Sequence, residues 1–335
     1  MIDSAIHTRH RGSTGRLRSP REHAFKRRRA IEEARAPDTE RRPGPIVVGV
    51  DGRRRSKDAL ALAARLAERT GGDLLLVHAH GYGPLERIVG EDGYRALVRT
   101  SFTASFYQAR AIVGERYAHE MRTISDASPA AGLQRIAESE GAQTIVVGPS
   151  RRSGLGRFRP GSVTERLFSG ATVPIAIAPA GYARHERPLA RVVCAFDGSP
   201  ESRLALNWAE ELTQQSDADL MVYSVHSPPA FGDVGVGRLF SRESANRTLR
   251  TKLEREQREA LAGRSARGLV MTGDPARTLA HATKNADLLV MGSHGYGPVR
   301  AALPGGVSQY VIRHASCPVV VCPRGAGLHE APGEG

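Results

Sequence analysis

The sequence predicts an α/β protein made of two doubly wound, mostly parallel domains of five strands each, and three observations favour this fold class. The chain has 335 residues and is 40% apolar, which is enough for two domains that each bury a core. Only 5% of its residues are aromatic, a balance typical of parallel sheets covered by helices rich in small residues. The third observation is an internal repeat, in which the second half of the chain copies the pattern of the first.

The repeat is clearest in the first half of each copy. The stretch PIVVGVDGRRRSKDALALAARLAERTGGDLLLVHAH, residues 45–80, is echoed by RVVCAFDGSPESRLALNWAEELTQQSDADLMVYSVH, residues 191–226. Each copy reads as an apolar strand, an Asp-Gly turn, a helix with Ala and Leu at helical spacing, and a second apolar strand. We align Asp51 with Asp197 and His78 with His226.

The second half of each copy matches as well. Three pairs of residues lie 144 positions apart: Gly148 and Gly292, Gly161 and Gly305, Pro174 and Pro318. Because all three pairs share one offset, the repeat extends over the whole unit and not only over its first strands.

The second copy shows the predicted elements in chain order. They are a strand at 192–196, a helix at 202–214, a strand at 219–226, a helix at 245–263, a strand at 269–272, a helix at 275–284, a strand at 287–291, a helix at 307–314 and a strand at 319–322. Ser199, followed by Pro200, is an N-cap for the first of these helices, and Ser56 is the N-cap of its counterpart. Strands that alternate with helices at this spacing predict right-handed crossovers and a parallel sheet.

The repeat and the composition together divide the chain. Residues 1–44 are predicted to be a basic, disordered tail, 45–181 the first domain, 190–324 the second domain, and 325–335 a disordered C-terminal tail. Nearly half of the net charge of +13 lies in the basic tail, which holds 12 Arg and Lys against 6 Asp and Glu. An arm that binds nucleic acid through KRRR, residues 26–29, is the alternative to a solvated extension; no aromatic interleaving supports it.

The cysteines and the apolar runs predict the compartment. Cys194, Cys317 and Cys322 are too few for a disulfide framework, and no pair has zinc-binding spacing, so we expect reduced thiols in the cytoplasm. No stretch approaches the roughly 20 apolar residues of a membrane span, and the N-terminus lacks the apolar core of a secretory signal. We therefore predict a cytoplasmic protein with no membrane association.

Glycine-rich loops mark the predicted binding sites. In open parallel sheets, ligands bind outside the carboxyl ends of the strands, where the strand order reverses. This topology brings loop 51–56 to loop 148–162, and loop 197–199 to loop 292–308. Glycine has no Cβ and tolerates positive φ, so such loops let backbone N–H groups approach a small anion. We predict a phosphate-binding crevice in each copy.

These loops resemble those of the universal stress protein family, whose ATP-binding members carry G-x2-G-x9-G-[ST] after the fourth strand and Asp at the end of the first. The second copy reads GSHGYGPVRAALPGGVS from Gly292, with Gly306 where the pattern has Ser or Thr. The first copy keeps Gly161-Ser162 but has Arg151 in place of the second glycine. The resemblance covers both copies and implies two Rossmann-like, adenine nucleotide alpha hydrolase-like domains whose last strands pair in an intrachain pseudo-dimer.

The resemblance also implies a ligand and its contacts. The ligand is ATP, with or without Mg²⁺; Asp51 and Asp197 would contact adenosine, and Ala79 and Ser227 would border the adenine. The glycine loops would hold ribose and phosphates through Gly148, Arg151, Gly161, Ser162, Val163 and Thr164 in the first copy, and through Gly292, His294, Gly295, Gly305, Gly306, Val307 and Ser308 in the second. The alternative for each aspartate is a turn residue that hydrogen-bonds its own backbone.

Electrostatics separates the two predicted crevices. Seven arginines lie on the two loops of the first copy: Arg53, Arg54, Arg55, Arg151, Arg152, Arg157 and Arg159. The second copy has only Arg300 in its glycine loop. We predict that the first crevice favours a polyanion and the second a nucleotide held by backbone groups.

No motif commits the chain to catalysis. The P-loop, the G-x-S-x-G elbow and the H-E-x-x-H motif are absent, and His78 with His80 lacks a third metal ligand, so we predict neither a catalytic residue nor a metal site. The resemblance implies a nucleotide-binding stress regulator or sensor that is at most a slow ATPase. It would act through protein partners that the sequence does not identify and would form a homodimer of the two-domain unit. The alternatives are a nucleotide hydrolase or phosphotransferase that uses His294 or the arginines, and a nucleotide-free interaction scaffold.

Overall fold

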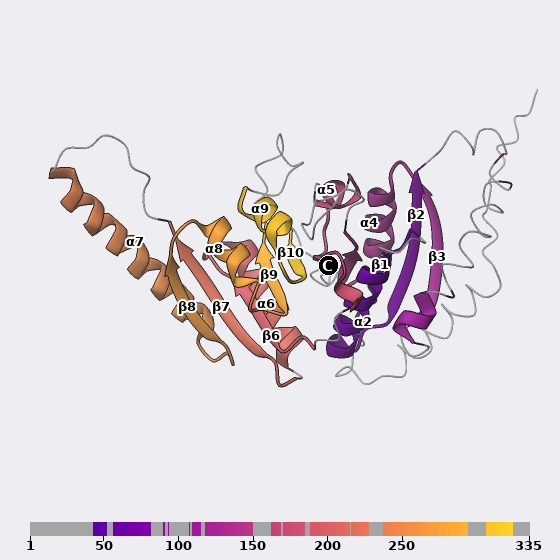
Figure 1. Ribbon diagram of the computed structural model, residues 1–335, viewed down its shortest axis with the longest axis horizontal. Helices are drawn as coiled ribbons and strands as arrows, with labels where there is room; N and C mark the ends of the chain where they lie inside the picture. The colour runs from indigo at the N-terminus through magenta and orange to yellow at the C-terminus, as the bar shows by residue number, and fades with distance from the viewer. Residues whose placement is uncertain are drawn as a thin grey trace, which may run out of the picture. The chain divides into compact units, whose positions relative to one another are not determined.

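A computed structural model of the chain describes most of residues 43–323 (Figure 1). The described stretches are 43–51, 56–81, 109–114, 118–149, 162–168, 170–184, 188–214, 216–227, 237–293 and 306–323, with the single residues 90, 93 and 107. Of residues 118, 119, 162 and 237–245 only the backbone is described. The predicted tails lie outside these stretches, apart from residues 43 and 44.

The described strands form one sheet in the order β3-β2-β1-β4-β5-β10-β9-β6-β7-β8. They are β1 (Ile46–Gly49), β2 (Leu74–Gly81), β3 (Ala118–Asp126), β4 (Thr144–Val147), β5 (Ile175–Ile177), β6 (Arg191–Ala195), β7 (Asp219–His226), β8 (Arg267–Thr272), β9 (Leu288–Gly292) and β10 (Val319–Cys322). Within each copy all pairs are parallel, whereas β5 and β10 pair antiparallel through Ala176 and Val320. The predicted fold class is confirmed, including the pairing of the last strands within one chain.

Helices cover both faces of the sheet. The described helices are α2 (Ser56–Thr70), α4 (Pro129–Ser139), α5 (Ser162–Phe168), the 3-10 turn η1 (Tyr182–Arg184), α6 (Pro200–Gln214), α7 (Gly237–Leu261), α8 (Pro275–Ala282) and α9 (Gly306–His314). Because successive strand residues point to opposite faces, Val47 and Val48 are both fully buried but belong to different cores. The core of Val48 includes α2 and α6, and that of Val47 includes α4, α5, α8 and α9.

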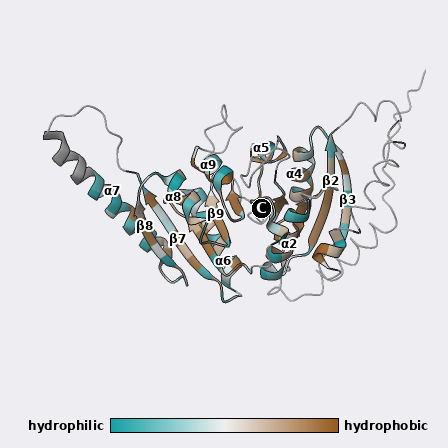
Figure 2. Cartoon of the chain, in the orientation of Figure 1, coloured by the Kyte–Doolittle hydropathy of each residue, from teal (hydrophilic) through white to brown (hydrophobic). Residues whose placement is uncertain are grey.

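The predicted elements of the second copy are found within about two residues of their predicted bounds, except α7. The predicted helix 245–263 begins eight residues earlier, at Gly237. Figure 2 shows apolar residues along strand β2 and mostly polar residues along the coloured, C-terminal part of α7. A helix that is polar almost all round has no apolar stripe, so periodicity does not reveal where it begins.

The segment that follows the first copy is anchored to helix α2. The buried carboxylate of Asp58 accepts hydrogen bonds from the backbone N–H groups of Gly181 (3.0 Å) and Ala183 (2.9 Å). The Arg65 guanidinium lies over the ring of Tyr182, 4.5 Å from its centroid, and Tyr182 is itself buried. The beginning of the connection between the two copies is therefore part of the packed fold.

Replacing Asp58 by alanine is expected to lower the free energy of unfolding by about 2 kcal/mol, because two backbone N–H groups lose a charged acceptor that is itself buried. Urea unfolding monitored by circular dichroism measures the change. Glu68→Ala is the matched control, since Glu68 lies exposed on the same helix and should change stability by less than about 0.5 kcal/mol. Equal effects of the two substitutions would contradict the anchoring role.

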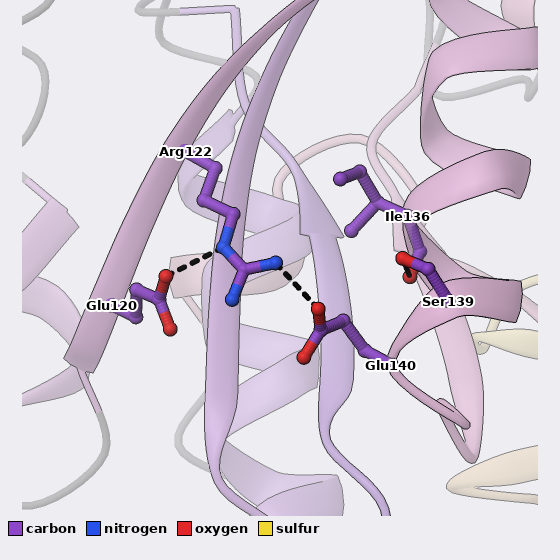
Figure 3. A network of polar contacts seen from close by, with 5 residues as sticks. All are labelled: Glu120, Arg122, Ile136, Ser139 and Glu140. Atoms are coloured by element: carbon purple, nitrogen blue, oxygen red, sulfur yellow. Dashed lines mark hydrogen bonds and ion pairs between the residues drawn. The ribbon is translucent and has the colours of Figure 1, made fainter. Parts of the chain in front are cut away.

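An arginine joins the first edge strand to a helix. Figure 3 shows the Arg122 guanidinium of β3 between two carboxylates, at 2.5 Å from Glu120 and 2.7 Å from Glu140. Glu140 is the C-cap residue of α4, and its backbone N–H donates to the carbonyl of Ile136. Burial by itself would lower the pKa of Arg122, but its hydrogen bonds to the two glutamates outweigh burial and raise it.

Candidate functional site

In the first copy, the carboxyl ends of the first and fourth strands lie side by side. Val48 of β1 pairs with Val146 of β4, so Asp51 and Gly148, which follow these strands, leave the sheet at the same edge. Asp51 is exposed. Its backbone N–H donates to Ser56 Oγ (2.9 Å), and this hydroxyl donates in turn to Asp51 Oδ1 (2.8 Å). The aspartate and the first residue of α2 thus hold each other across the predicted loop.

The second copy repeats the backbone contact of this arrangement, whereas the Ser202 hydroxyl donates to the carbonyl of Ser199 (2.9 Å) and not to the aspartate. Ala195 of β6 pairs with Met291 of β9, and the Asp197 N–H donates to Ser202 Oγ (3.4 Å). In addition, Asp197 Oδ1 accepts from the backbone N–H (3.0 Å) and the hydroxyl (2.5 Å) of Ser199. Gly198 between them has φ +83°, a left-handed conformation that favours glycine. One carboxylate oxygen of Asp197 therefore serves the turn, as the turn-residue alternative describes.

The sequence did not predict that Ser56 and Ser202 accept a hydrogen bond from the backbone N–H of the site aspartate. The pattern Asp-x4-Ser occurs in both copies, at 51 and 56 and at 197 and 202, and this repeat could have revealed them. Ser199 is confirmed as a cap, because its Oγ accepts from the N–H of Ser202 at 3.1 Å.

Gly292 has a structural role that the phosphate prediction did not include. A Cβ built on Gly292 would lie 2.6 Å from the carbonyl carbon of Glu201 and 2.7 Å from the backbone nitrogen of Ser202. The missing side chain therefore allows α6 to pack directly against the end of β9. Gly306, at the first position of α9, is exposed, and among the described residues a Cβ there would meet nothing within 4 Å.

The remaining predicted loop residues differ in placement. Thr164 and Ser308 are each 3% exposed, and Val163 and Val307 pack partly buried against the core on the α5 and α9 face. Arg151, Gly161, His294, Gly295, Gly305 and the side chain of Ser162 lie outside the described residues, as do the arginines of the predicted polyanion crevice.

Two sequence assignments near the second strand need correction. Pairing of Ile46 with Leu74 and of Val192 with Leu220 shows that His80, not His78, occupies the position of His226. The alignment of His78 with His226 is therefore wrong by two residues, because identical residue types were matched without counting from the strand. For the same reason Ala79 lies within β2, whereas Ser227 directly follows β7 and is exposed.

His78 lies beside the first aspartate loop. Its Nδ1 donates to the carbonyl of Val50 (3.0 Å), and its ring centroid is 6.1 Å from that of His80. Burial lowers the pKa of His78; the positive potential of His80 acts in the same direction, while the Val50 carbonyl and Asp51 oppose the shift. Among the described residues, no group of three or more His, Cys, Asp or Glu side chains is placed to hold a metal ion.

The lowered pKa of His78 predicts a pH dependence of stability. As pH falls below the ordinary histidine pKa of 6.5, the unfolded chain binds a proton at His78 before the folded chain does. Stability should therefore decrease below this pH, by at most about 1.4 kcal/mol per pH unit. His78→Asn keeps a donor for Val50 and should remove part of this decrease in unfolding free energies measured from pH 8 to pH 5, whereas the exposed His281→Asn should not.

Comparison with known proteins identifies the family. The sequence model of the universal stress protein family matches residues 44–179 and, separately, residues 189–323. The chain belongs to the universal stress protein family. A universal stress protein of Mycobacterium tuberculosis is 29% identical over 294 residues, covering 82% of this chain and 96% of the relative. One of Mycolicibacterium smegmatis is 30% identical over 288 residues, with the same coverage of both chains.

Solved structures of universal stress proteins share the fold. One from Archaeoglobus fulgidus has a TM-score of 0.59 at 19% identity and covers 84% of this chain and 97% of its own. A putative universal stress protein from Pseudomonas aeruginosa has a TM-score of 0.56 at 16% identity, with coverages of 85% and 94%. None of the helices in the described part of the chain combines the length and apolar character that a membrane crossing requires.

Proposed function

We propose that this universal stress protein binds ATP in the crevice of its second copy and acts as a stress-response regulator. The arrangement that supports this proposal most directly is the pair of adjacent strand ends β6 and β9, where the strand order reverses and Asp197 stands exposed. In the first copy the loop departs from the family pattern at Arg151, so we assign the second copy the higher affinity for ATP.

The described residues suit the parts of such a ligand. The nine-residue helix α9 begins at the exposed Gly306, where a Cβ would meet none of the described residues within 4 Å, and such a helix N-terminus favours an approaching phosphate. At the end of β6, the Asp197 carboxylate is suited to accept hydrogen bonds from the ribose hydroxyl groups of adenosine. In our proposal the nucleotide spans these two elements, with or without Mg²⁺.

The cysteines agree with the cytoplasmic location that we propose. Cys194, Cys317 and Cys322 are free and buried, and burial raises the pKa of all three thiols. Buried thiols of this kind suit a reducing compartment, where they remain apolar parts of the core.

Isothermal titration of the full chain with ATP tests the proposal, with and without Mg²⁺. Asp197→Asn keeps an acceptor for the Ser199 turn but removes the charge, so we expect folding to be unchanged and ATP affinity to fall about tenfold, or about 1.4 kcal/mol. Asp51→Asn reports on the first copy, and the exposed Asp217→Asn is the control. A wild-type chain that binds no ATP at millimolar concentration would refute the proposed function.

A further inference from the structure

The two ends of the sheet differ in how they are protected from other strands. β3 and β8 are the outermost strands, so each has an edge that pairs with no described strand. Such an edge presents backbone N–H and C=O groups to any other strand, and soluble proteins usually block it with charges, bulges or covering elements.

β3 carries these protective features. The register between β2 and β3 shifts between Leu74 and Leu75, which marks a bulge or irregularity. Three charged residues of β3, Glu120, Arg122 and Asp126, take part in ion pairs. This edge is therefore poorly suited to pair with another strand.

Within the described residues, β8 shows no register shift and carries no charge beyond its first residue. It pairs with β7 in regular register from Met221 and Arg267 to His226 and Thr272. Its sequence RGLVMT has a single charge, at Arg267, which pairs with Asp219 at 3.1 Å. At the register position that Arg122 occupies in β3 stands Leu269, whose side chain is 44% exposed.

Apolar side chains are exposed on β8 and on the helix that packs beside it. The described part of the chain has three large exposed apolar side chains, and two of them are Leu269 of β8 and Leu249 of α7, at 51%. Helix α7 lies beside β7 and β8 (Figure 1), and its Gln257 Nε2 donates to the carbonyl of Val222 at 3.0 Å. A Cβ on Gly268 would meet Gln257 and Leu261 of α7, so the next residue, Leu269, faces the opposite side of the sheet.

We propose that the chain forms a homodimer in which β8 pairs antiparallel with β8 of a second copy. A strand that pairs with its own copy about a two-fold axis is self-complementary, because both edges offer the same backbone groups. In a pairing centred on Leu269, this leucine faces its own counterpart and Arg267 faces Met271 of the second copy, so like charges do not meet. The second copy would also cover Leu269 on one face and bring the two α7 helices, with Leu249, together on the other.

Sedimentation equilibrium of the full-length chain tests this dimer. The wild type is expected to reach twice the 36.1 kDa of one chain with increasing concentration. Leu269→Lys places a cation on the edge and should weaken dimerisation at least tenfold, while Thr123→Lys, at an exposed position of β3, should leave it unchanged. Unchanged circular dichroism confirms that both variants fold. A monomeric wild type, or equal dimerisation of both variants, would overturn the proposal.

A crosslinking experiment identifies the contact independently. Leu269→Cys places an exposed thiol at the proposed two-fold contact, whereas the native cysteines are buried and remain unreactive. Mild oxidation should give a disulfide-linked dimer of Leu269→Cys and none of Thr123→Cys. Crosslinking at position 123 in preference to 269 would show that the chain associates by another surface.

Discussion

Gly292→Val is expected to destabilise the protein by about 3 kcal/mol or more, the largest effect among the predicted substitutions. The atoms that the new side chain would meet, 2.6–2.8 Å from its Cβ, all belong to the backbone of Glu201 and Ser202. A side-chain neighbour could rotate away, whereas these atoms form the first turn of α6 and can move only with the helix. The thermal midpoint should fall by roughly 5 °C or more.

The matched control is Gly306→Ala, at the other end of the same loop. Among the described residues a Cβ at Gly306 meets nothing within 4 Å, so the unfolding free energy should stay within about 0.5 kcal/mol of the wild type. Differential scanning calorimetry of both variants, followed by ATP titration of those that fold, separates packing from ligand binding. If Gly292→Val melted like the wild type and lost only ATP affinity, its glycine would serve the ligand and not the helix.

Gly292 shows which parts of the structure the sequence predicts and which it does not. The repeat and the strand-helix alternation predict a parallel, doubly wound sheet in each copy, because apolar periodicity reports directly which residues are buried. The pairing of the last strands of the two copies comes from the family resemblance. The same reasoning assigns the missing Cβ of Gly292 to a phosphate, because a helix that packs against a strand end leaves no pattern in the sequence. The site is thus predicted as a place in the fold, while the partners of its residues are not.

Long-range polar contacts are a second kind of interaction that the sequence does not reveal, beside the packing of a helix against a strand end. Asp58 aligns with Leu204 of the second copy, and this difference marks a position with a special role but does not name Gly181 and Ala183 as its partners. The local contact of Asp197 with Ser199 agrees with the turn-residue alternative stated for each aspartate, because an Asp-Gly turn favours hydrogen bonds to its own backbone.

Arg122→Met is expected to lower the free energy of unfolding by about 2 kcal/mol. The guanidinium is 19% exposed, and the Glu120 and Glu140 side chains are 24% and 10% exposed, so the substitution leaves two half-buried carboxylates without their cation. This loss of unfolding free energy is smaller than that expected for a fully buried ion pair, because water still reaches the three side chains. Glu140 adds to the destabilisation, since an unpaired carboxylate at the C-terminal end of α4 interacts unfavourably with the helix dipole.

A double-mutant cycle with Glu140→Gln distinguishes this ion pair from simple loss of arginine packing. If the carboxylate left behind causes most of the cost, the double variant should be more stable than the sum of the single effects predicts, by about 1 kcal/mol. Additive effects at neutral pH would mean that the methylene groups of Arg122, and not its charge, join β3 to α4.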